Sequence, residues 1–170
     1  GSEGAMIMTF QSSLHDEANF SYWAAWQDRR QLQNLHFPGV YILAISQTQL
    51  SGKAFSWIEE IAYVGMTNSV NGLLGRLRQF DNTIRGKQGH GGAERFCNDY
   101  HKPEDLFPLL YVAVFSFPCE VTALTSRDLR IMGDVAKAEY ECFARYVNDF
   151  GRMPRYNDKA ISPKPKKQQR

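Results

Sequence analysis

Two tyrosines and an arginine lie close together in this sequence, in a region that also contains glycines suited to close backbone approach. Tyr41 ends the segment Gly39-Val40-Tyr41, Tyr63 begins the segment Tyr63-Val64-Gly65, and Arg76 follows shortly afterwards. A guanidinium binds oxyanions through parallel hydrogen bonds, and a phenol both donates and accepts hydrogen bonds. Glycine lets another backbone or a ligand approach closely. This combination is more than a packed core requires, and it indicates a functional site.

One carboxylate interrupts an apolar helical pattern further along the chain. Glu139 shares a face with apolar residues that recur at three- and four-residue steps. These residues are Val135, Cys142, Phe143, Tyr146, Val147 and Phe150. Burying a carboxylate without a partner costs about 1–3 kcal/mol even when it is partly compensated. We therefore expect Glu139 to meet a metal ion, an arginine or a hydroxyl, whereas Glu141 lies on the opposite, solvated side.

The two tyrosine segments belong to apolar runs that predict a β-hairpin. The runs Val40–Ile45 and Ile61–Val64 are rich in β-branched and aromatic residues, and Ser51-Gly52-Lys53 marks a turn between them. After the hairpin, Thr67-Asn68-Ser69 supplies N-cap chemistry for a helix over about 70–84.

The helix predicted over 70–84 carries two arginines that are expected to face different sides. Its apolar residues form a single stripe of Leu73, Leu77, Phe80 and Ile84. Arg76 lies at the edge of this stripe and is predicted to face the sheet. Arg78 is predicted to point away from it.

The remaining segments predict a small mixed domain. Phe20–Leu35 has the spacing of an amphipathic helix, and Leu109–Phe117 reads as a strand buried on both faces. Between the second helix and that strand, Arg85–Pro108 is a long polar segment of the kind that is usually functional or mobile. Thr125-Ser126-Arg127-Asp128 has the capping-box pattern that begins a long helix, and Gly151 ends it.

Composition sets the broad class of protein. The chain has 170 residues, 43% hydrophobic and 22% charged, which is typical of one soluble globular domain. The net charge of +2 neither requires nor excludes nucleic acid. Cys97, Cys119 and Cys142 are odd in number and widely spaced, which favours reduced thiols in a cytosolic protein. No apolar run is long enough to span a bilayer, so we expect a cytoplasmic protein without membrane contact.

The order of these features resembles that of the GIY-YIG endonuclease family. A strand with Gly-Val-Tyr is followed by a strand with Tyr-Val-Gly, a helix with Arg, a strand, a helix with Glu, and Pro-x-x-Asn at 154–157. The resemblance runs from Gly39 to Asn157. It implies an α/β (α+β) fold with a small three-stranded antiparallel sheet flanked by helices. It also implies metal-dependent hydrolysis of phosphodiester bonds in DNA.

The resemblance assigns a role to each residue that matches the family pattern. Tyr41 and Tyr63 would supply or position the general base that deprotonates the attacking water, and which of the two is the base stays open. Arg76 would hold the scissile phosphate. Glu139 would anchor Mg²⁺ or Mn²⁺, a hard cation that suits one carboxylate together with water and substrate oxygens. The gap from Glu139 to Asn157 is longer than in the family pattern, which leaves Glu141 as the alternative anchor, and the helical face favours Glu139. Asn157 would support the site.

Two positions depart from the family pattern. Met66 follows the second glycine motif where many members have a polar or basic residue, and Phe80 stands four residues after Arg76 where several branches have His or Tyr. His90, in the glycine-rich loop that follows, is either an ordinary exposed histidine or an auxiliary residue that replaces the missing polar group.

DNA binding is expected from basic residues near the site. The cations predicted to contact DNA are Arg78, Arg85, Lys87 and Arg95. The segments predicted to bind it are the connections Gln47–Glu60 and Arg85–Pro108 and the basic tail. Trp57, Phe96 and Tyr100 are predicted to contact bases or sugars. The expected substrate is DNA, either double-stranded or branched.

These expectations divide the chain into four parts. Residues 1–6 resemble a cloning scar, 7–37 are predicted to form an N-terminal helical extension, 38–160 form the nuclease-like domain, and 161–170 form a basic disordered tail. The main alternative is a non-catalytic nucleic-acid-binding module of the same fold. A structural or protein-interaction domain is the third possibility, and no extended exposed apolar stripe favours it.

Overall fold

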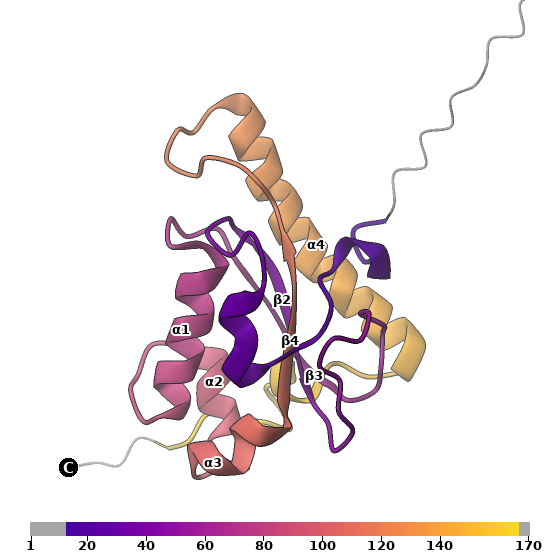
Figure 1. Ribbon diagram of the computed structural model, residues 1–170, viewed down its shortest axis with the longest axis vertical. Coiled ribbons are helices and arrows are strands. Elements are labelled where there is room, and N and C mark those ends of the chain that lie inside the picture. The colour runs from indigo at the N-terminus through magenta and orange to yellow at the C-terminus, as the bar shows by residue number, and fades with distance from the viewer. Residues whose placement is uncertain (1–12, 167–170) are drawn as a thin grey trace, which may run out of the picture.

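The computed structural model describes residues 13–166, and within them the chain folds around one four-stranded antiparallel sheet (Figure 1). The strand order is β1-β4-β2-β3, which makes β3 an edge strand. The strands are β1 (Ala24–Ala25), β2 (Gly39–Ile45), β3 (Ile61–Thr67) and β4 (Leu110–Ser116). The α-helices are α1 (Gly72–Ile84), α2 (Gly91–Phe96), α3 (Pro103–Leu106) and α4 (Ser126–Phe150). Short 3-10 helices are η1 (Glu17–Asn19), η2 (Trp26–Gln31), η3 (Phe107–Leu109) and η4 (Arg155–Asn157).

The predicted hairpin is confirmed as β2 and β3, and its register brings the two tyrosine segments together. Tyr41 pairs directly with Gly65, and Leu43 pairs with Tyr63. Side chains directly opposite one another share a face of the sheet, and diagonal neighbours lie within reach of aromatic rings. Tyr41 and Tyr63 are therefore diagonal neighbours on one face.

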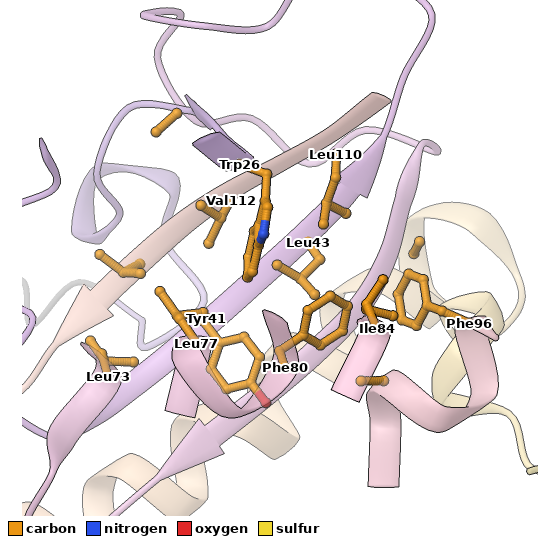
Figure 2. Packing of buried hydrophobic residues seen from close by; sticks show 14 of the residues in the cluster. Trp26, Tyr41, Leu43, Leu73, Leu77, Phe80, Ile84, Phe96, Leu110 and Val112 are labelled. Carbon is orange, nitrogen blue, oxygen red and sulfur yellow. The ribbon is translucent and has the colours of Figure 1, made fainter. Parts of the chain in front are cut away.

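Helices cover both faces of the sheet. On the face that carries Tyr41, the predicted stripe of α1 is buried, and Figure 2 shows Leu73, Leu77, Phe80 and Ile84 packed beside Tyr41 and Leu43. On the other face, α4 packs on β2 and β3 (Figure 1), with Ala138, Cys142 and Tyr146 in the core.

The ends of α4 follow the predicted chemistry. The Thr125 hydroxyl accepts a hydrogen bond from the backbone N–H of Asp128 at 3.1 Å, which satisfies one free donor of the first turn. Gly151 ends the helix with φ of 76°, a left-handed conformation that glycine adopts without steric cost. The helix that holds Glu139 is thus fixed at both ends by local sequence.

The N-terminal part of the prediction is wrong. The segment Phe20–Leu35, predicted as an amphipathic helix, instead forms β1 and the 3-10 helix η2. Most of its apolar side chains still enter the core, and Trp23 and Trp26 are each 1% exposed, whereas Tyr22 is 46% exposed. The strand β1 pairs with β4, so the sheet has four strands in place of the predicted three. Burial of large aromatic rings by tertiary contacts here outweighs helical spacing.

Two other predictions change with the structure. The predicted loop Arg85–Pro108 contains the helices α2 and α3. The basic tail is ordered at its start, because the Ser162 side chain is buried and its hydroxyl donates to the carbonyls of Arg155 and Asp158 at 2.8 and 2.7 Å. The predicted cloning scar at 1–6 and the tail residues 167–170 lie outside the described residues.

Cys97, Cys119 and Cys142 are all free thiols, in agreement with the prediction. Among residues 13–166, none of the helices combines the length and apolar character needed to cross a bilayer.

Candidate active site

Both tyrosine rings lie against a glycine that leaves no room for a side chain. A Cβ atom built on Gly65 would lie 2.4 Å from Cζ and Oη of Tyr41, and one built on Gly92 would lie 2.5 Å from the same atoms of Tyr63. Gly65 is the cross-strand partner of Tyr41, so the Tyr41 ring lies across the backbone of β3. The missing side chain at Gly65, in the second motif, therefore leaves the space that the Tyr41 ring of the first motif occupies.

His90 is buried beneath these rings. Its side chain has no exposed surface, and Nε2 lies 2.7 Å from Oη of Tyr41. The other ring nitrogen, Nδ1, accepts a hydrogen bond from the backbone N–H of Ala93 at 3.0 Å. Because Nδ1 is an acceptor, the proton of the neutral ring lies on Nε2, and this proton is donated to Tyr41. Of the two alternatives for His90, the exposed loop histidine is wrong.

The electrostatic surroundings keep His90 neutral. Burial, with a further contribution from the Arg76 charge, lowers the pKa of the imidazole to about 3. The Phe80 ring contacts the imidazole edge-on, with centroids 5.3 Å apart and planes at 86°. Phe80, at the position that departs from the family pattern, thus supports an imidazole that arrives from the following loop.

The two phenols and the imidazole form one cluster. Ring centroids are 6.0 Å apart for Tyr41 and Tyr63, 6.1 Å for Tyr41 and His90, and 5.9 Å for Tyr63 and His90. Tyr41 is fully buried, whereas Tyr63 is half-buried and lines a pocket of about 170 Å³. The pocket is bounded by two aromatic side chains, Asn157, two glycines and four cations. They are Tyr63, Tyr156, Asn157, Gly91, Gly92, Arg76, Arg95, Lys159 and Lys164.

Arg76 reaches this cluster from α1. It is half-buried, its Nη1 donates to Oε1 of Gln79 at 2.9 Å, and it lines the same pocket as Tyr63. Arg78 is exposed and lines a different pocket with Arg30 and His36. The predicted difference in facing between the two arginines is therefore confirmed.

The pKa values of the two phenols depend on burial and on the neighbouring charged groups. Burial raises the pKa of Tyr41 well above its usual value, Tyr63 raises it further, and Arg76 opposes both. Burial also raises the pKa of Tyr63, while Tyr41, Arg76 and Arg95 lower it and Glu139 raises it. Both phenols are therefore protonated at rest, and the arginines are the groups that ease their ionisation.

Glu139 approaches from α4, on the other side of β3. It is half-buried, and burial raises the pKa of its carboxyl while Arg76 lowers it. Within residues 13–166 it forms no ion pair shorter than 4.0 Å, so its oxygens are free for a ligand. No group of three or more ionisable metal ligands occurs in the same range. A single half-buried carboxylate still fits Mg²⁺, which retains water and takes ligand oxygens.

Asn157 holds the edge strand in place. Its Oδ1 accepts from the N–H of Val64 at 2.8 Å, and its Nδ2 donates to the carbonyl of Val64 at 2.9 Å. Val64 lies between Tyr63 and Gly65, on a strand whose outer edge has no neighbouring strand. The amide thus satisfies backbone groups that a further strand would otherwise bond, and it fixes the position of Tyr63.

The residues predicted to bind DNA are not all brought together. Arg95 lines the site pocket, and Lys87 lines an adjoining one. Arg78, also predicted to contact DNA, lines neither of these pockets but a separate one. Arg85 donates to Asp81 at 2.9 Å and lies over the Phe107 ring, so its guanidinium already has partners. Asp81 also accepts from Trp26 at 2.9 Å in a buried cluster that sequence reasoning missed.

Two aromatic residues predicted to contact DNA lie in the core. Phe96 is fully buried and stacks on Tyr156 with centroids 3.9 Å apart. Trp57 is 8% exposed, and its indole N–H donates to the carbonyl of His15 at 2.9 Å. These two predictions are wrong, because both rings are used in packing. Tyr100 is half-buried and lines a depression beside the site.

That depression is larger, about 440 Å³, but its charges are largely paired. Arg155 lies 3.0 Å from Asp99, and Arg152 lies 3.7 Å from Glu59. The smaller pocket at Tyr63 has four lining cations and no lining acid. It is therefore the better match for a phosphate.

Comparison with family models, curated proteins and solved structures found no match to this chain. The functional interpretation therefore rests on the residues and their geometry.

Proposed function

We propose that this protein is a metal-dependent DNA endonuclease of the GIY-YIG type, which hydrolyses phosphodiester bonds. The observation that carries the proposal is that Tyr63 and Arg76 line one small cationic pocket, with Tyr41 directly behind it and the Glu139 charge close enough to act on both. These side chains come from two strands and two helices. Four residues selected by sequence resemblance thus share one electrostatic environment, which separate structural roles do not require.

Arg76 is the group that would hold the scissile phosphate. Its guanidinium offers two parallel N–H donors, and its partners in the described residues are the exposed Gln79 and the hydroxyl of Tyr41. Arg95, Lys159 and Lys164 add positive charge around the same space. Charge spread over the phosphate oxygens during displacement is stabilised by such fixed cations.

Tyr63 is the phenol placed to contact the attacking water, because it lines the pocket while Tyr41 has no exposed surface. Tyr41 and His90 lie behind it. The Nε2–H of His90 points at Oη of Tyr41, so His90 is a donor that orients the phenols and does not itself take a proton. We therefore assign His90 and Tyr41 as positioning residues.

Glu139 would hold Mg²⁺ or Mn²⁺, which when bound would neutralise phosphate charge and lower the pKa of a coordinated water. Within residues 13–166 the chain supplies the remaining features: a half-buried carboxylate without an ion pair, and an arginine whose charge opposes the effect of burial on the carboxyl pKa. A cytoplasmic location, which agrees with three free cysteines, belongs to the same proposal.

The proposal is tested with supercoiled plasmid DNA. Purified protein should nick or linearise the plasmid in Mg²⁺, with no products in EDTA. Arg76→Ala should abolish cleavage, and the matched variant Arg78→Ala, on the same helix but outside the pocket, should retain it. Salt-sensitive DNA binding without cleavage in any divalent metal would contradict the proposal and select the non-catalytic binding module instead.

A further inference from the structure

A second pocket adjoins the candidate active site and shares one lysine with it. The shared residue is Lys164, which lines both the pocket at Tyr63 and a larger one of about 630 Å³. The larger pocket lies between the loop that precedes α2 and the C-terminal segment, and Figure 1 shows that segment, in yellow, leaving the molecule beside α2. Its lining residues are Thr83, Gly86, Lys87, Gln88, Glu94, Cys97, Lys164, Pro165 and Lys166.

The two pockets adjoin at Lys164, and we refer to them together as the cationic groove. Six basic side chains line it, namely Arg76, Arg95, Lys159, Lys164, Lys87 and Lys166. One acid, Glu94, lines it as well, and its carboxylate lies 3.6 Å from Nζ of Lys164. A Cβ atom on Gly91 would lie 3.1 Å from the same Nζ. The absence of a side chain at Gly91 therefore leaves space for the Lys164 amine where the two pockets adjoin.

The C-terminal segment is held so that its lysines face the groove. The buried Ser162 hydroxyl bonds two carbonyls of the preceding turn, and the Asn98 side chain donates to the carbonyl of Pro163. A residue before proline is restricted to extended backbone, which applies to Lys164 before Pro165. In extended chain, residues two apart lie on the same side, and Lys164 and Lys166 both line the groove.

We infer that this groove binds the sugar-phosphate backbone of one strand of duplex DNA as it leaves the scissile phosphate. A row of ammonium and guanidinium groups matches successive phosphates. The larger pocket has no aromatic lining residue on which an unstacked base could rest, which favours backbone contact over single-strand base stacking. Contacts of this kind position DNA and do not read its sequence.

The inference uses the proposed nuclease function only for the location of the scissile phosphate, so its test measures binding alone. The probe is a fluorescein-labelled 30-base-pair duplex, titrated in EDTA at several salt concentrations. The variant Lys87→Ala/Lys164→Ala/Lys166→Ala should weaken binding and reduce the slope of log Kd against log salt by about 2 to 3, since each phosphate contact contributes about 0.9. The arginine version, Lys87→Arg/Lys164→Arg/Lys166→Arg, should restore the wild-type slope.

A charge-matched control separates the groove from general attraction. Arg30, Arg78 and Arg130 are exposed and do not line the groove, so replacing all three by Ala should leave the slope close to that of the wild type. An unchanged slope in the lysine variant, or an equal loss in the arginine control, would overturn the inference. Tight wild-type binding without cleavage would contradict the proposed function and leave the groove intact.

Discussion

The two tyrosines occupy opposite halves of the same site. Tyr41, on the inner strand β2, is fully buried and receives a hydrogen bond from a histidine that is itself buried. Tyr63, on the edge strand β3, lines an open pocket with Arg76, and its hydroxyl is the hydrogen-bond partner of the Tyr41 hydroxyl. Tyr41 is thus enclosed between His90 and Tyr63, whereas Tyr63 also borders the pocket.

A small sheet can thus hold one phenol rigidly in its interior while another, on the edge strand, stays accessible to a ligand. The inner half costs desolvation of a phenol and an imidazole, and its hydrogen bonds largely offset that cost. In the outer half Tyr63, Arg76 and Glu139 are only half-buried, and the phenol and the guanidinium both border the pocket. We therefore expect changes in the inner half to alter stability, and changes in the outer half to alter chemistry.

The largest expected effect is that of Tyr63→Phe. Removing this hydroxyl should lower the single-turnover cleavage rate by about 100-fold or more, which is the usual contribution of a general base. The free energy of unfolding should fall less than in Tyr41→Phe, because Tyr63 is half-buried whereas Tyr41 and His90 have no exposed surface. Cleavage of a defined duplex, with urea unfolding alongside, measures both quantities.

Tyr41→Phe is the comparison for that variant. It leaves the Nε2–H of His90 buried without an acceptor, which should lower the free energy of unfolding by about 1–3 kcal/mol. If Tyr63→Phe were the more destabilised of the two, the division between an inner and an outer half would be wrong.

Gly65→Ala should damage the inner half through packing. The new methyl group would overlap the Tyr41 ring, and displacing a buried ring of this size should cost about 1–3 kcal/mol of stability. Gly133→Ala is the matched control, because a Cβ there has no atom within 4 Å and α4 gains a better helix former. Thermal unfolding compares the two variants. Equal stability of both would contradict the proposed packing of the Tyr41 ring against Gly65.

The smallest effect concerns pH. The pKa of His90 is about 3 in the folded protein, whereas an unfolded histidine titrates near 6.5. Below that value the unfolded chain gains a proton that the folded chain does not, so stability is present above pH 6.5 and falls toward pH 3. Between pH 7.5 and 5.5 the loss attributable to His90 should be about 1.4 kcal/mol.

The variant His90→Asn isolates this term, because an Asn side chain can accept the Ala93 N–H but does not titrate. Urea unfolding at both pH values should show a smaller pH dependence in the variant than in the wild type. The same pH dependence in both proteins would mean that His90 is not held neutral.

Sequence alone predicted the parts of this fold that depend on local patterns. Apolar runs located β2, β3 and β4, and helical spacing located α1 and α4 and separated Arg76 from Arg78. Tertiary contacts decided the rest. The aromatic residues before β2 pack into the core without forming the predicted helix, because Trp23 and Trp26 are buried by strand and loop contacts.

The site was only partly predictable for a related reason. His90 stood in a glycine-rich polar segment, where spacing gives no sign of burial, and its role depends on a hydrogen bond across 49 residues to Tyr41. Lys159 and Lys164 reach the pocket because η4 and Ser162 fold the chain back over α2, a long-range contact that no local pattern encodes.

The most direct test of the account compares two glutamates on one helix. Glu139→Gln and Glu141→Gln each remove one negative charge from a half-buried position on α4. The single-turnover cleavage rate in Mg²⁺ should fall by about 100-fold or more in Glu139→Gln, because a metal anchor provides several kcal/mol of transition-state stabilisation. It should stay near the wild-type rate in Glu141→Gln. Full activity in Glu139→Gln, with both variants folded, would contradict the proposed site.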